Sequence, residues 1–226
     1  MLRRIGAAPV SGRRTVAQTP EAGFASQCLG EFLRRLTRVD PHPAVLDLGI
    51  LCGGNIAFLG ARGCRVSVES LPNPARVEKT GQTDKAPASG KKEAGAAMPP
   101  HPLSPLSYPP GSFSGVLAWD SIARLAHPEA VAFVETLRQL LLDGGVILAH
   151  FPGPPGNAGG AGFRYRIIGE DQLCLEPSTR RHAAVAAYQN RDIYTLFSRF
   201  DVVRLSHLKS GTREVLVART RRPARA

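Results

Sequence analysis

Residues 44–54, AVLDLGILCGG, decide the fold that this chain is expected to adopt. Residues 44–49 are a short, almost wholly apolar run that predicts a buried strand, and a glycine-containing turn follows it. Residues 56–61 then predict a short helix, and residues 64–69 predict a second strand, in which valines alternate with smaller or polar residues. A strand, a helix and a strand in this order are typical of a parallel pair of strands joined by a crossover helix.

The same alternation extends outward from this stretch. Upstream, apolar residues four apart from Phe24 to Leu36 predict a helix that ends before Pro41 and Pro43. Downstream, we expect a strand at 113–119, a helix from Pro128 to Gly144-Gly145, a strand at 146–151, an extended segment at 163–175, a helix at 191–198 capped by Asn190, and strands at 200–208 and 214–219. The sequence therefore predicts a doubly wound α/β fold with a mostly parallel, seven-stranded sheet and an antiparallel C-terminal hairpin.

Composition divides the chain into one domain and three other segments. Residues 72–110 hold nine of the 19 prolines and show no apolar periodicity, so we expect a disordered Pro/Gly/Lys-rich insertion at 72–105. Residues 23–71 and 106–220 then form a single domain. Residues 1–22 are expected to be a disordered basic leader, with an organellar transit peptide as the alternative, and residues 221–226 a basic tail.

The formal net charge of +11 permits nucleic acid as a partner. However, 24 of the 29 basic residues are arginines, which equally indicates a compositional bias, and the excess lies at the two ends of the chain. None of the four cysteines forms a C-x-x-C pair, so no metal site is predicted. No apolar run approaches the ~20 residues that cross a bilayer, and we expect a cytoplasmic protein without membrane contact.

In an open parallel sheet, ligands bind beyond the carboxyl ends of the strands. Gly49 and Gly53 allow a tight turn there, and they let backbone approach a ligand. Leu51 occupies the second glycine position of the dinucleotide-binding fingerprint, which argues against a nicotinamide enzyme. Asp47, just before the turn, suits a cationic ligand better than a pyrophosphate.

Residues 45–53, an acid followed by a glycine-rich loop, resemble the first motif of the class I S-adenosylmethionine-dependent methyltransferases. Residues 108–120 are similar to the family's stretch leading into the fourth strand, and residues 142–148 to its glycine turn and fifth strand. The resemblance covers about two-thirds of the chain and implies a Rossmann-like methyltransferase fold with S-adenosylmethionine as cofactor. Leu51 departs from the family's first motif, and residues 98–107 lack the acid that often contacts adenine.

The resemblance also assigns candidate residues. It implies that Asp47, Gly49, Gly53, Glu69 and Trp119 bind the cofactor, with the loop around its amino-acid part and Glu69 on the ribose hydroxyls. Glu69 is alternatively an ordinary surface acid, and Trp119 alternatively fills core space.

Two further residues are candidates for a general base, because they lie at strand ends that would face the pocket. Asp120 ends the fourth strand and is alternatively a helix cap. His150 ends the fifth strand and is alternatively a structural histidine.

Three functional hypotheses follow. The first is methyl transfer to a small-molecule or otherwise unidentified acceptor, for which alignment of the nucleophile supplies much of the rate. The second is a catalytically inactive member of the fold that serves as a binding or assembly protein. The third is an RNA-directed methyltransferase that uses its basic ends. The oligomeric state is not indicated by the sequence.

Overall fold

The computed structural model describes residues 23–69, 106–153, 162–178 and 188–221. The expected leader at 1–22, all of the expected insertion at 72–105 and most of the basic tail lie outside these residues. The ranges expected to form one domain, 23–71 and 106–220, contain all the helices and strands described below.

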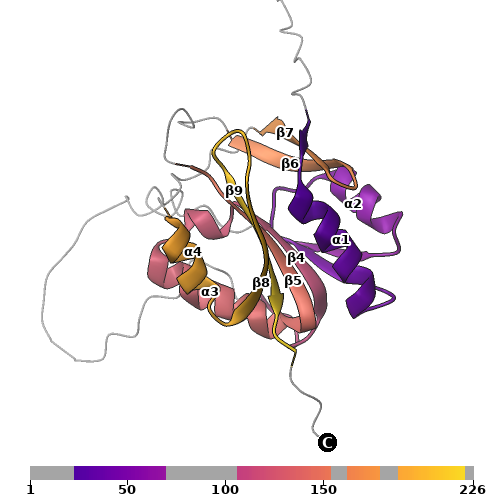
Figure 1. Ribbon diagram of the computed structural model, residues 1–226. Coiled ribbons are helices and arrows are strands. Elements are labelled where there is room, and N and C mark those ends of the chain that lie inside the picture. The colour runs from indigo at the N-terminus through magenta and orange to yellow at the C-terminus, as the bar shows by residue number, and fades with distance from the viewer. Residues whose placement is uncertain (1–22, 70–105, 154–161, 179–187, 222–226) are drawn as a thin grey trace, which may run out of the picture.

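A six-stranded sheet forms the centre of the described structure (Figure 1). Its order is β3 (Arg65–Val68), β2 (Ala44–Asp47), β4 (Phe113–Trp119), β5 (Leu141–Phe151), β9 (Arg213–Arg219) and β8 (Phe200–His207). The first four strands are parallel, whereas β9 is antiparallel to both of its neighbours. The doubly wound, mostly parallel sheet and the antiparallel C-terminal hairpin are thereby confirmed.

The extended segment predicted at 163–175 does not join this sheet. It forms a hairpin of β6 (Gly162–Gly169) and β7 (Gln172–Ser178), and β1 (Phe24–Ala25) pairs with β7 to complete a separate three-stranded sheet. The main sheet therefore has six strands among the described residues where seven were expected. The hairpin packs its β6 strand against α2 (Gly53–Gly60).

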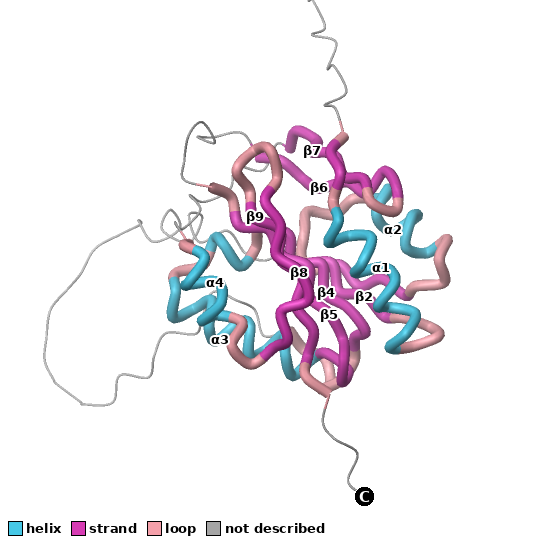
Figure 2. Tube along the Cα trace, in the orientation of Figure 1, coloured by secondary structure: helices cyan, strands magenta, loops and turns pink. Residues whose placement is uncertain are grey.

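Helices cover both faces of the main sheet (Figure 2). On one face lie α1 (Gln27–Val39) and α2, and on the other lie α3 (His127–Leu140) and α4 (Asn190–Leu196). Each face has its own apolar cluster, and β4, buried along its whole length, contributes to both. This burial explains why β4 is a continuous apolar run and not an alternating one. Within the described part of the chain, no helix has the length and apolar character needed to cross a membrane.

Several helix boundaries differ from the prediction, and two of these differences have a structural reason. The helix expected to run to Gly144-Gly145 ends at Leu140, because the chain enters β5 directly and Gly144, with φ of 81°, lies within that strand. The last helix begins at Asn190 itself, one residue earlier than expected. Its N-cap is Gln189, whose backbone N–H donates to the Asp192 carboxylate at 2.8 Å.

The contact between α1 and the sheet depends on a glycine in β4. A Cβ added at Gly115 would lie 2.5 Å from Leu36 Cδ2 and 2.8 Å from Phe32 Cζ. Both of these α1 side chains are buried, so the helix approaches the strand as closely as a missing side chain allows.

Replacing this glycine tests the packing. We expect Gly115→Ala to destabilise the fold by about 1–3 kcal/mol, because the added methyl group overpacks a filled core. The measurement is the urea midpoint of unfolding followed by circular dichroism. Gly60→Ala is the matched control. Gly60 is the last residue of α2, and nothing lies within 4 Å of a Cβ added there, so this substitution should be neutral or stabilising. Equal midpoints for Gly115→Ala and wild type would contradict the close approach.

Candidate functional site

Asp47, the last residue of β2, anchors the bend that follows this strand. Asp47 is only 1% exposed, and its carboxylate accepts three hydrogen bonds. Trp119 Nε1 donates to Oδ1 at 2.6 Å, the Gly49 N–H donates to Oδ1 at 2.9 Å, and Asn55 Nδ2 donates to Oδ2 at 3.4 Å. Burial raises the pKa of Asp47, and these three donors act in the opposite direction. The carboxylate thus holds the backbone turn in place.

Trp119, at the end of β4, belongs to a stack of three rings. Its indole lies parallel to the Tyr165 ring, with centroids 5.0 Å apart and an interplanar angle of 7°. The imidazole of His150 lies 5.9 Å from Trp119 and 4.7 Å from Tyr165. The structure therefore brings together three residues predicted from the sequence, Asp47, Trp119 and His150. It adds Tyr165 from β6, which covers the carboxyl ends of β4 and β5.

Asn55, which the sequence analysis did not single out, fastens this cover. Its Nδ2 donates to the Tyr165 carbonyl at 3.0 Å, and its Oδ1 accepts the Ile167 N–H at 2.8 Å. The side chain is buried, and it also reaches Asp47. The sequence did offer a signal for Asn55, because it is a polar residue between the two glycines and the apolar part of the helix predicted at 56–61. Its role became visible only when β6 was seen to pack on α2.

The bend from Gly49 to Gly53 is closed at its first residue and open at its last. A Cβ at Gly49 would meet Trp119 Cδ1 at 2.7 Å, so only glycine fits beneath the indole. At Gly53, where α2 begins, a Cβ would meet nothing within 4 Å. Leu51, the departure from the family motif, is 60% exposed and does not fill the core. The bend is therefore open at Leu51 and Gly53, whereas Cys52 between them is buried.

Glu69 lies at the neighbouring strand end, directly after β3. Its backbone N–H donates to the Asp47 carbonyl at 2.9 Å, and its Oε1 accepts the Tyr108 hydroxyl at 2.7 Å. Tyr108 packs against the apolar cluster of α3 and α4, whereas Trp119 belongs to the cluster of α1 and α2. The backbones of the two acids are adjacent, but their carboxylates contact opposite layers of the sheet.

Asp120 is ion-paired with Arg124, one helical turn later. The cap of the short 3₁₀ helix Ile122–Arg124 is Ser121, and the Ser121 hydroxyl donates to the Leu48 carbonyl at 3.0 Å. Asp120 is therefore neither that cap nor joined to the ring stack by a hydrogen bond among the described residues.

His150, at the end of β5, is fully buried and paired with Glu214, the residue opposite it on β9. The distance from His150 Nε2 to Glu214 Oε1 is 3.2 Å. The other ring nitrogen, Nδ1, has no hydrogen-bond partner among the described residues. A histidine held through one nitrogen by a buried carboxylate, with the other nitrogen unpaired, is an arrangement suited to a general base.

Glu214 is held in turn by the N-terminus of α1. Its carboxylate accepts the Ser26 hydroxyl, the Cys28 N–H at 3.2 Å and the Ser206 hydroxyl at 3.4 Å. Ser26 is also the N-cap of α1, through a 3.0 Å bond from the Leu29 N–H. Burial acts to raise the pKa of Glu214, but the His150, Ser26 and Cys28 contacts outweigh it and hold this pKa below 4.5. An anion at a helix N-terminus is also favoured by the helix dipole.

Sequence reasoning missed Glu214, although a signal was present. An acid that starts an otherwise apolar strand is unusual in a buried element. The prediction treated residues 214–219 as part of a terminal edge hairpin, whereas β9 lies inside the sheet between β5 and β8. Only that position puts Glu214 opposite His150.

No group of three or more His, Cys, Asp or Glu side chains within the described ranges is arranged to hold a metal ion.

The order β3-β2-β4-β5-β9-β8, with an antiparallel strand next to the last parallel one, completes the description of this sheet. This arrangement is consistent with a Rossmann-like methyltransferase fold. In open α/β sheets, ligands bind beyond the carboxyl ends of the parallel strands, and Asp47, Glu69 and Trp119 lie at that edge.

Solved structures with similarity to the chain include several methyltransferases. A sugar N-methyltransferase from Streptoalloteichus sp ATCC 53650 is 16% identical, with a TM-score of 0.47 over 97% of this chain and all 100% of that one. An S-adenosylmethionine-dependent methyltransferase from Clostridium acetobutylicum is 10% identical, with a TM-score of 0.48 over 87% and 93%. A 1,6-didemethyltoxoflavin-N1-methyltransferase from Burkholderia thailandensis is 16% identical, with a TM-score of 0.44 over 86% and 79%. These similarities are too distant to carry any of those activities over to this chain.

No family model matches the sequence, and no curated protein matches it either.

The Glu214 network makes stability depend on pH. Because the folded-state pKa is lowered, ionised Glu214 stabilises the fold above its unfolded pKa, and this contribution is lost as the pH falls through the folded pKa. We expect Glu214→Gln to cost about 3 kcal/mol at pH 7, since it leaves buried donors without a charged partner, and less below pH ~4. Urea unfolding at several pH values measures this difference.

Glu135→Gln is the control, because Glu135 also has a lowered pKa but pairs with Arg138 at the surface. Its cost should stay below about 1 kcal/mol. A pH-independent cost of Glu214→Gln would contradict the ionised state of Glu214 in the fold.

Proposed function

We propose that the protein is an S-adenosylmethionine-dependent methyltransferase that acts on a small-molecule or other unidentified acceptor. The observation that carries this proposal is the adjacency of two acids at the ends of neighbouring parallel strands. Asp47 ends β2, Glu69 follows β3, and the Glu69 N–H donates to the Asp47 carbonyl at 2.9 Å. A glycine bend that is open at Gly53 begins beside them.

The residues present fit the polar parts of the cofactor in two places. Glu69 accepts Tyr108 on Oε1, which leaves Oε2 for ribose hydroxyls. The N–H groups of the first turn of α2, starting at Gly53, suit the carboxylate of the methionyl part. Asp47 acts indirectly in this proposal, since its hydrogen bonds to Trp119 and Gly49 shape the bend.

When bound, the cofactor supplies an electrophilic methyl group on a positively charged sulfur. The chain's own contribution is to align the acceptor and, for an acceptor that must lose a proton, to take up that proton. His150 suits this second role. In the tautomer that carries its proton on Nε2, that N–H donates to Glu214 and the lone pair of Nδ1 is left for the acceptor's proton. Because His150 is fully buried, an acceptor reaches Nδ1 only when the packing around this ring opens.

Cofactor binding is the direct test, and the chain carries a built-in probe. Trp119 is the only tryptophan of the protein, so its fluorescence reports on this site alone. We expect saturable quenching by S-adenosylhomocysteine, the demethylated product. Glu69→Gln should weaken binding about tenfold or more, because a charged hydrogen bond is worth about 1.5–3 kcal/mol.

Glu170→Gln is the matched control. Glu170 is a surface acid that pairs with Arg62 at 3.2 Å, and its loss should leave the affinity unchanged. Calorimetry that detects no heat at millimolar S-adenosylhomocysteine, together with an unchanged Trp119 spectrum, would overturn the proposal.

A second candidate function is that of a binding or assembly protein without catalysis. It is favoured by the ring stack, in which Tyr165 covers both Trp119 and His150, and by the three donors already bound to Asp47. Transfer of a labelled methyl group from S-adenosylmethionine to components of a cell extract separates the two candidates. Label in small molecules or protein supports the first, label confined to RNA supports the RNA-directed alternative, and binding without any transfer supports the second candidate.

A further inference from the structure

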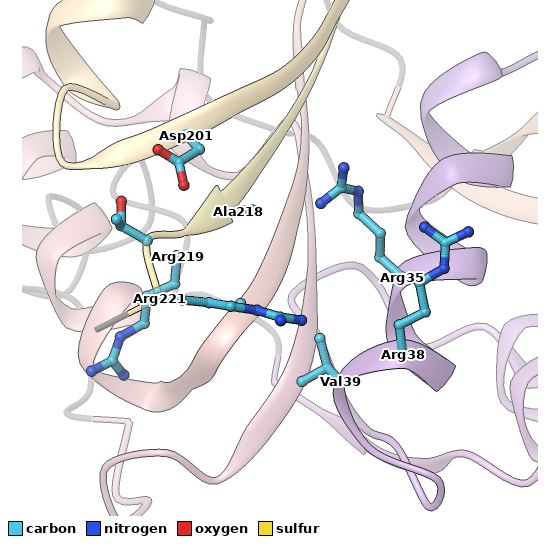
Figure 3. Close-up of a pocket in the computed structure, with 9 residues that line it drawn as sticks. Arg35, Arg38, Val39, Asp201, Ala218, Arg219 and Arg221 are labelled. Carbon is cyan, nitrogen blue, oxygen red and sulfur yellow. The ribbon is translucent and has the colours of Figure 1, made fainter. Parts of the chain in front are cut away.

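A pocket of about 380 Å³ lies at the opposite edge of the sheet from the candidate site. One wall is the last turn of α1, which provides Arg35 and Arg38 (Figure 3). The other is the end of β9 and the residues after it, which provide Arg219 and Arg221, with Asp201 of β8 nearby. Its floor includes Gly144, near the start of β5, whereas Asp47 lies at the far, carboxyl end of the strands.

The charge of this pocket is strongly positive, since four guanidinium groups line it against one carboxylate. Arg35 and Arg219 are held in place by ion pairs outside the pocket, with Glu31 at 2.8 Å and Asp143 at 3.2 Å. Arg38 and Arg221 are exposed, and no ion pair is formed by either among the described residues. Arg35 and Arg219 are thus fixed by their partners, whereas the donors of Arg38 and Arg221 are available to a ligand.

Arg221 lies over the start of β5. Gly144 has φ of 81°, a conformation that favours glycine, and it presents no side chain to the pocket. The Arg221 side chain lies against this glycine, since a Cβ added there would be 2.8 Å from Arg221 Nε. The last arginine of the described chain therefore lies over β5 in the structure.

We infer that this pocket binds a small ligand that carries a phosphate group. The planar fork of donors of arginine matches phosphate oxygens bidentately, and four arginines line this pocket. The volume lies within the range of about 300–1,000 Å³ that is typical of small-molecule pockets. Asp201 adds an acceptor for a hydroxyl group of the same ligand, as in a sugar phosphate. This inference does not depend on cofactor binding at Asp47 and Glu69.

Isothermal titration with ribose 5-phosphate, inorganic phosphate and unphosphorylated ribose tests the inference, at 50 mM chloride with the full chain. We expect saturable binding of ribose 5-phosphate, weaker binding of inorganic phosphate and none of ribose. Arg38→Gln and Arg221→Gln should each weaken the binding about tenfold, as the loss of a charged hydrogen bond predicts. Both side chains are exposed, and circular dichroism checks that the variants remain folded.

Arg191→Gln is the matched control, because Arg191 has a side chain 81% exposed in α4 and does not line the pocket. Its affinity should equal that of wild type. Absence of saturable binding up to 10 mM phosphate ester (about the weakest affinity a single charged contact would leave) would overturn the inference. An equal loss in Arg191→Gln would do the same. Tight binding of a polyuridine of 12 nucleotides that ribose 5-phosphate does not displace would also overturn the inference, since this would assign the arginines to a nucleic-acid backbone.

Discussion

The described fold depends on one buried carboxylate, that of Glu214. It is fully buried at the start of β9, where it joins the N-terminus of α1 through Ser26 and Cys28 to β5 through His150. Ser206 of β8 completes the group. A buried charge is tolerated only when it is paired and hydrogen-bonded, so these four elements must occupy their native positions together. Hydrophobic contacts alone would allow the side chains between α1 and the sheet to pack in more than one way. The Glu214 carboxylate therefore selects one arrangement of this layer.

A second buried carboxylate organises the neighbouring strand ends. Asp47 orders the bend after β2 and orients Trp119, while Asn55 ties the β6 hairpin down over both. The two networks meet at the stacked rings of Trp119, Tyr165 and His150. A change at either acid is thus transmitted to the same covered edge of the sheet. At this edge the Tyr165 ring covers the rings of Trp119 and His150.

The fold class could be predicted because local signals agreed with one another. Apolar runs, glycines and prolines marked most strands of the main sheet and most of the helices within a few residues, including the strand that ends at Asp47 and the glycine bend after it. What could not be predicted depends on long-range pairing. The partners of His150 and Trp119 come from β9 and β6, and nothing in the local sequence states that β9 lies inside the sheet or that residues 162–178 form a sheet of their own. The direction of Glu69, toward Tyr108, is likewise a property of the packed layers.

The interior position of β9 has a consequence for folding. Among the described strands β9 comes latest in the sequence, yet it separates β8 from β5, so β8 has no partner in the sheet until residues 213–219 are in place. Until then one edge of β5 is unpaired, and an open strand edge is a template for association with other chains. Insertion of β9 therefore closes the sheet and at the same time brings in the acid that pairs with His150.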